Sequence, residues 1–129
     1  MTISYDDTRT KEFRLKLFPV NFDQTKAFYA EKLMYPILDE WNRSDSDRGV
    51  MFDTGVAVIE LLTPNKGKVV GCNLSLEVAD VWSLWAKLEG DPVVADALKD
   101  NSWGDSSFGI LDPDGFQITF FTQYIHRKE

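Results

Sequence analysis

Imidazole and thiol groups are scarce in this sequence. The single histidine is His126, in the charged tail HRKE, and the single cysteine is Cys72. Catalytic zinc sites usually need two or three imidazoles, and Ser/His or Cys/His nucleophiles need a positioned one. The sequence therefore argues against both kinds of chemistry. It leaves carboxylates, amides, hydroxyls, cations and aromatic rings as the groups that can meet a ligand.

These groups recur along several predicted strands in which side chains alternate, so that one row of side chains is apolar and the other carries the groups named above. One row of each strand must meet the helices, so the opposite row faces away from them. The opposite rows mix polar and aromatic groups, as a ligand cleft does, although a solvated sheet face is the alternative. They comprise Arg14, Lys16 and Phe18; Val56, Val58, Glu60 and Leu62; Asn73, Ser75 and Glu77; and Gln117, Thr119 and Phe121.

The first half of the chain is expected to supply a strand, a helix and three more strands. Alternation from Phe13 predicts the first strand, and a helix capped by Asn21 or Asp23 must end before Pro36. Short strands are predicted at 37–41, 49–52 and 56–62, separated by the turns NRSDSD and Asp53-Thr54-Gly55. Residues 1–11 lack periodicity and are expected to form a loose arm or an edge strand.

The second half is predicted to repeat this order. A strand at 69–78 leads to a helix that is capped by Asp80 and ends at Gly90. Trp82 and Trp85 are assigned to helix packing, with a subunit contact as the alternative for Trp82. Strands near 92–95, 107–111 and 116–122 follow, the last two joined by the turn DPDG. The expected fold class is α+β, with two βαβββ modules at about 12–64 and 68–123 in a single domain, 1–129.

A shift of 59 residues supports the duplication. It pairs Leu15 with Leu74, Leu17 with Leu76, Asp53 with Asp112, Ile59 with Ile118, and Leu61 with Phe120. The same shift maps Arg14 onto Asn73 and Glu60 onto Thr119. If a pseudo-twofold axis relates the halves, these four side chains converge near it.

Composition limits the class of partner. The chain has 129 residues, 43% of them hydrophobic, and a net charge of −7. This charge disfavours nucleic acid, which requires clustered Lys and Arg. No secretory signal and no membrane-length apolar run is present. A cytoplasmic protein that binds a small molecule, without nucleic acid or membrane, is the resulting expectation.

Several segments together resemble the vicinal oxygen chelate superfamily, which includes glyoxalase I, extradiol dioxygenases and bleomycin-resistance proteins. They are FPVNFDQTKAFYAEKL, the IELL strand, LSLEVADV and WGDSSFGILDPDGFQITFF. The resemblance covers residues 13–122 and is most specific at Trp103-Gly104 followed by Asp112-Pro113-Asp114-Gly115. It implies an open half-barrel, often completed in a homodimer.

The resemblance also implies where a metal would bind. Metal-dependent members carry ligands on the first, fourth, fifth and eighth strands, which correspond here to Arg14, Glu60, Asn73 and Thr119. A guanidinium repels a cation, and an amide and a hydroxyl are poor substitutes for imidazoles. We therefore expect no metal and no other cofactor. The resemblance then favours a metal-free binder of an antibiotic or of an aromatic or cationic metabolite, with Trp41, Trp103, Phe18 and Phe121 as stacking surfaces.

Two alternatives remain open. The chain could be a lyase, isomerase or dioxygenase-type enzyme of the same superfamily, with Glu60 as general base and Arg14 stabilising an oxyanion. It could also be a metal enzyme that uses Glu77 in place of Asn73. The catalytic residues are otherwise unknown. Cys72 is expected to be a small buried residue rather than a reactive thiol.

Overall fold

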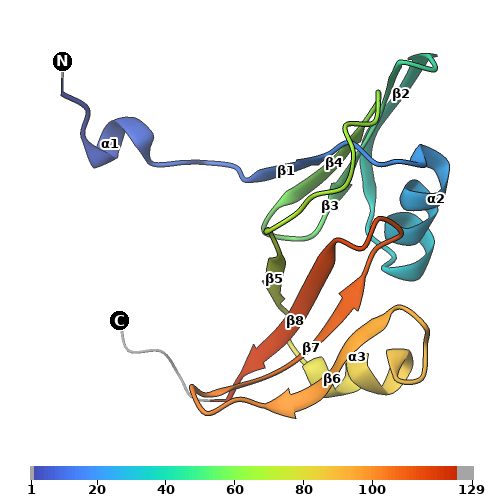
Figure 1. Cartoon of the computed structure of the whole chain (residues 1–129). Helices are drawn as coiled ribbons and strands as arrows, with labels where there is room; N and C mark the ends of the chain where they lie inside the picture. Colours follow the sequence, from blue (N-terminus) through green and yellow to red (C-terminus); the bar gives the residue numbers. More distant parts are fainter. Residues whose placement is uncertain (1, 125–129) are drawn as a thin grey trace. The chain divides into compact units, whose positions relative to one another are not determined.

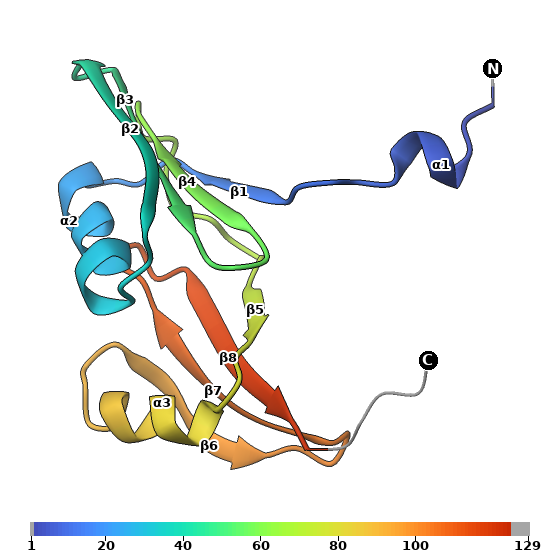
Figure 2. The same cartoon turned by 180° about the vertical axis from the view of Figure 1, so that it is seen from behind.

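The computed structural model describes residues 2–124, in two compact units that divide between Gly67 and Lys68. Each unit contains a four-stranded sheet with one helical segment against it (Figures 1 and 2). No helix in the part of the chain that the structure describes is long and apolar enough to cross a membrane.

The first unit holds a mixed sheet with the order β1-β4-β3-β2. Its strands are β1 (Arg14–Leu17), β2 (Ile37–Ser44), β3 (Asp47–Asp53) and β4 (Val58–Leu62). β1 and β4 run parallel, whereas β3 is antiparallel to both of its neighbours. The helical segment comprises α2 (Phe22–Ala27) and a π-helical turn, η1 (Phe28–Lys32). Tyr29 of η1 is fully buried, and its ring centroid lies 5.9 Å from that of Phe52 on β3.

The helical segment formed by α2 and η1 begins after Asn21, one of the two predicted caps, and ends before Pro36 as predicted. Asn21 is the N-cap, and its side chain accepts a hydrogen bond from the Gln24 N–H at 3.0 Å. Met34 takes a positive φ of 60° just after η1, so the chain turns away before Pro36. Nearby, burial raises the pKa of Tyr35 to about 12, which keeps its phenol protonated.

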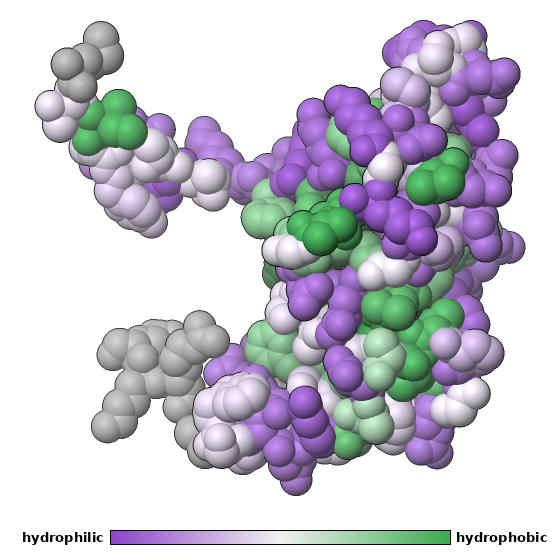
Figure 3. Space-filling view, viewed as in Figure 1, coloured by the Kyte–Doolittle hydropathy of each residue, from purple (hydrophilic) through white to green (hydrophobic). Residues whose placement is uncertain are grey.

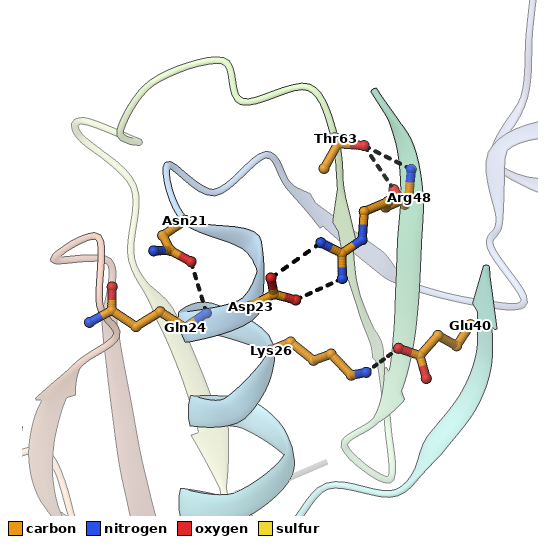
Figure 4. A network of polar contacts seen from close by, with 7 residues as sticks. All are labelled: Asn21, Asp23, Gln24, Lys26, Glu40, Arg48 and Thr63. Atoms are coloured by element: carbon orange, nitrogen blue, oxygen red, sulfur yellow. Dashed lines mark hydrogen bonds and ion pairs between the residues drawn. The ribbon is translucent and has the colours of Figure 1, made fainter. Parts of the chain in front are cut away.

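Ion pairs tie α2 to the β2–β3 hairpin (Figure 4). Arg48 on β3 donates to both carboxylate oxygens of Asp23, at 2.7 and 3.3 Å, and its guanidinium lies 4.3 Å from the centre of the Phe22 ring. The hydrogen bond from Arg48 lowers the pKa of Asp23. Lys26 pairs with Glu40 on β2. Figure 3 shows mainly hydrophilic residues over the outer end of this hairpin.

The second unit repeats the arrangement with the order β5-β8-β7-β6. Its strands are β5 (Leu74–Glu77), β6 (Val94–Asp100), β7 (Asp105–Leu111) and β8 (Gln117–Gln123), and its helix is α3 (Val81–Leu88). As predicted, Asp80 caps α3 by accepting from the Ser83 N–H at 3.0 Å, which lowers the pKa of Asp80. In the DPDG turn, the Asp112 carboxylate accepts from the N–H groups of Asp114 and Phe116.

Strand register confirms the internal repeat. Leu15 and Leu17 on β1 lie opposite Ile59 and Leu61 on β4. The residues 59 positions later pair in the same way, Leu74 with Ile118 and Leu76 with Phe120. The two sheets therefore share one topology, which confirms the α+β fold of tandem βαβββ modules.

Several predicted boundaries were wrong. Residues 5–8 form a helix, α1 (Tyr5–Thr8), because the Ser4 N–H donates to the Asp7 carboxylate. The strand expected at 69–78 is confined to β5, and Val70 before it is exposed. The strands β2 and β3 extend into the NRSDSD segment, where Arg43 pairs with Asp47. The strand expected near 92–95 starts at Val94 and continues to Asp100.

Candidate functional site

In the second unit, α3 covers one face of the sheet and the opposite face is open. The Trp85 ring of α3 lies 5.2 Å from that of Phe108 on β7, and Phe108 is paired with Phe120 on β8. Since side chains alternate along a strand, Ser107, Gly109 and Thr119 point away from α3.

A recess of about 180 Å³ lies on this open face, within the second unit. Its β6 side and the following loop contribute Asp96, Lys99, Asn101 and Trp103. Its β7 and β8 side contributes Ser107, Phe108, Gly109, Gln117 and Thr119. Sites for drug-sized ligands measure roughly 300–1,000 Å³, so this volume suits one functional group and part of a ring.

A hydrogen-bond chain holds an indole at the recess. The buried Asn101 amide donates to Asp105 at 2.7 Å and to the Ser107 hydroxyl at 2.9 Å. The other oxygen of the Asp105 carboxylate accepts from the Trp103 indole N–H at 3.1 Å. Trp103 is 74% exposed, and its N–H is already paired. It therefore presents the flat face of its ring rather than a hydrogen-bond donor.

A second chain crosses the sheet over a glycine. The Gln117 amide donates to Asp96 at 3.1 Å and to the Thr119 hydroxyl at 3.3 Å. A Cβ on Gly109 would lie 2.9 Å from the amide nitrogen of Gln117 and 3.2 Å from the Asp96 carboxylate. Glycine at this position therefore leaves room for the bridge between Asp96 and Gln117.

The first unit contains a buried carboxylate on the face of its sheet opposite η1. Glu60 is 6% exposed, and its Oε1 has no hydrogen-bond partner among the described residues. Arg14 lies 4.0 Å from this oxygen and is also paired with Glu12 at 3.1 Å. Lys16 is the cross-strand neighbour of Glu60. The predicted proximity of Arg14 and Glu60 is confirmed, whereas their convergence with Asn73 and Thr119 stays a prediction.

Two predicted stacking rings of the first unit, Trp41 and Phe18, already contact other residues of the same unit. The Trp41 indole lies against β3, so closely that a Cβ on Gly49 would be only 2.0 Å from its ring. The Lys66 ammonium lies over the Phe18 ring, 4.2 Å from its centre. Val56, expected on the fourth strand, lies before β4 and is 84% exposed.

The other residues of the second unit that were predicted to bind a ligand do not line the recess. Ser75 lies opposite Thr119, and Glu77 lies opposite the half-buried Phe121. Glu77 accepts two hydrogen bonds from Gln123. Asn73 precedes β5 and is exposed.

The expectation that Cys72 is buried was wrong. Cys72 is exposed, because strand pairing begins only at Leu74. Trp85 packs against the sheet as expected, whereas Trp82 is 43% exposed on α3, and its subunit contact stays a prediction.

The donor set does not fit a divalent metal. Of the four positions that correspond to family ligands, only Glu60 is a conventional ligand, and it lies beside the Arg14 guanidinium. Within residues 2–124, no group of three or more His, Cys, Asp or Glu side chains is placed to hold an ion. His126 lies outside the described residues.

Of the nine residues that line the recess, the sequence identified three, Trp103, Gln117 and Thr119. Asp96 and Lys99 were missed because the strand was expected to end at residue 95. Ser107 and Gly109 lay in a predicted strand, but its outward row was not assigned. Gly109 was the available signal, since a glycine inside a strand often marks a close approach of other groups.

Comparison with solved structures identifies the fold. No protein-family model matches the chain, and no curated protein sequence matches it. A member of the glyoxalase/bleomycin resistance protein/dioxygenase superfamily from Sphaerobacter thermophilus superposes with a TM-score of 0.72 at 16% identity, over 88% of this chain and 98% of that one. The lactoylglutathione lyase of Agrobacterium tumefaciens gives 0.68 at 16%, over 88% and 93%. TnmS3, an antibiotic binding protein from a Streptomyces species, gives 0.64 at 21%, over 88% and 96%.

The chain therefore has the fold of the glyoxalase/bleomycin resistance/dioxygenase superfamily, as the sequence resemblance implied. Proteins with this fold include both binders and enzymes, so the fold alone does not assign the chemistry.

Proposed function

We propose that this protein binds a small aromatic organic molecule in the recess on the open face of its second sheet. The observation that carries the proposal is Trp103, an exposed indole held by Asp105 beside a recess of polar groups. Exposing a large apolar ring to water is unfavourable, and a ring held in one orientation is well suited to stacking on a planar ligand.

The ligand class follows from the fold and from the recess together. One protein with this fold, TnmS3, is an antibiotic binding protein, which supports testing antibiotics first. Small aromatic or cationic metabolites form the second group. Because the recess is smaller than a complete drug site, such a ligand would extend from it over the Trp103 ring.

Ligand screening tests this proposal. A ligand that binds the folded state raises its melting temperature by mass action. For any hit, Trp103→Ala is expected to weaken binding about fivefold, since an aromatic pair contributes about 0.5–1.5 kcal/mol. Trp82→Ala is the matched control, because Trp82 is also exposed but lies on α3. Equal affinities of the two variants would remove Trp103 from the site.

A second candidate function rests on Glu60. A buried carboxylate oxygen without a donor, next to an arginine, is an arrangement that a general base and an oxyanion stabiliser require. This reading makes the protein a metal-free lyase or isomerase. Turnover of a bound compound, abolished by Glu60→Gln, would favour it. Binding without turnover would favour the primary proposal.

The expected setting is also part of the proposal. We place the protein in the cytoplasm as a homodimer. Analytical ultracentrifugation of the purified chain tests the oligomeric state, and a monomer at all accessible concentrations would contradict it.

A further inference from the structure

We infer that the recess recognises a carboxylate on its ligand, through the Lys99 ammonium and the hydroxyls of Ser107 and Thr119. This inference rests on the proposed function and narrows its ligand class from aromatic molecules in general to aromatic acids. It follows from counting which hydrogen-bonding groups are already occupied.

The orientations of two amides are fixed by their carboxylate partners. An ionised carboxylate only accepts hydrogen bonds, so the amide ends facing Asp105 and Asp96 must be NH₂ groups. The NH₂ group of Asn101 then donates its second hydrogen to Ser107. The NH₂ group of Gln117 likewise donates its second hydrogen to Thr119.

Both hydroxyls therefore act as acceptors within the protein. A hydroxyl that accepts from an amide N–H keeps its own hydrogen for another partner. No protein acceptor for the hydroxyl hydrogen of Ser107 or of Thr119 is recorded among residues 2–124. Each hydroxyl can thus donate to a ligand in the recess.

Lys99 adds a positive charge to this set of donors. It is the cross-strand neighbour of Ser107 and lines the recess. Its ammonium has no recorded ion pair with any side chain that the structure describes. One cation and two hydroxyl donors match the acceptor-only chemistry of a carboxylate.

The acidic groups nearby limit the strength of this recognition without reversing it. Both oxygens of Asp105 accept hydrogen bonds, from Asn101 and Trp103. Asp96 accepts from Gln117 but still carries a negative charge beside the recess. We therefore expect a moderate preference for an acid over its neutral analogue, about tenfold, in line with one charge-assisted hydrogen bond.

Calorimetric titration with three matched probes tests the inference. The probes are 2-naphthoate, 2-naphthalenemethanol and 2-naphthylmethylamine. They share the naphthalene ring and differ in charge, being an anion, a neutral alcohol and a cation. The expected order is acid first, by about tenfold over the alcohol, and amine last. Lys99→Met should reduce acid binding about tenfold and leave alcohol binding within twofold.

Two further variants separate the recess from general charge effects. Thr119→Val keeps the side-chain shape, removes the hydroxyl donor and should weaken acid binding about fivefold. Lys87→Met removes an exposed lysine from α3 and should change nothing. An amine or alcohol that binds as well as the acid overturns the inference and leaves the proposed function standing. If none of the three probes binds the folded protein, the inference fails, while the proposed function is decided separately by the ligand screen that includes antibiotics.

Discussion

Substituting alanine for two glycines on the open faces is expected to change different properties, stability at Gly49 and ligand affinity at Gly109. At Gly49 the added Cβ would lie 2.0, 2.3 and 2.6 Å from three atoms of the Trp41 ring. A rigid indole cannot yield by that much without leaving its place. Overpacking costs about 1–3 kcal/mol, and the lower entropy of the unfolded chain offsets about 0.4–1 kcal/mol of it. Gly49→Ala should therefore lower the free energy of unfolding by about 1–2 kcal/mol.

At Gly109 the Cβ would meet the far ends of two side chains, Gln117 and Asp96. Both can swing aside, at the cost of one hydrogen bond worth about 0.5–1.5 kcal/mol. The entropic gain of about 0.4–1 kcal/mol nearly cancels this loss. Gly109→Ala should therefore leave stability within about 1 kcal/mol while reducing ligand affinity, because it fills the recess and displaces Gln117.

Urea unfolding followed by circular dichroism measures the first quantity, and calorimetric titration with 2-naphthoate measures the second. The fluorescence of Gly49→Ala should also shift to the red, as Trp41 moves into water. The reasoning is refuted if Gly49→Ala is as stable as the parent, or if Gly109→Ala keeps full affinity.

Three further predictions concern the helix cap, pH and metal. Asn21→Ala should cost about 1 kcal/mol of stability in urea unfolding, because the Gln24 N–H loses its acceptor; an unchanged midpoint would count against the cap. The pKa of Asp23 is lowered in the folded state, so its stabilising contribution is complete above the ordinary aspartate pKa of about 3.9 and is lost as the pH falls through the lower folded value. Asp23→Asn should therefore flatten the decline of melting temperature in this acid range, and an unchanged decline would contradict the assignment. Exhaustive treatment with a chelator should leave melting temperature and ligand affinity unchanged, whereas stoichiometric Zn, Ni, Fe or Mn in protein purified without chelator would contradict the metal-free account.

The topology was predictable because local signals agreed with it. The caps Asn21 and Asp80 and the DPDG turn each depend on one residue and its immediate neighbours. The repeat was readable because Leu15 and Leu74 occupy equivalent registers opposite Ile59 and Ile118.

The site was harder to predict because its residues meet only through pairing between distant strands. Asp96 and Gln117 are 21 positions apart and become neighbours across Gly109. Nothing local distinguishes Lys99 from other surface lysines until β6 is extended to Asp100. Trp41 was expected to be free because its contact with Gly49 also depends on strand register.

Mapping of ligand-induced chemical-shift changes by ¹H–¹⁵N NMR tests the central claim most directly. With 2-naphthoate, the largest changes should fall on the backbone amides of Ser107, Gly109 and Thr119 and on the indole N–H of Trp103. Changes concentrated on α3 or on the first sheet around Glu60, with these four signals unmoved, would contradict the assignment of the recess as the binding site.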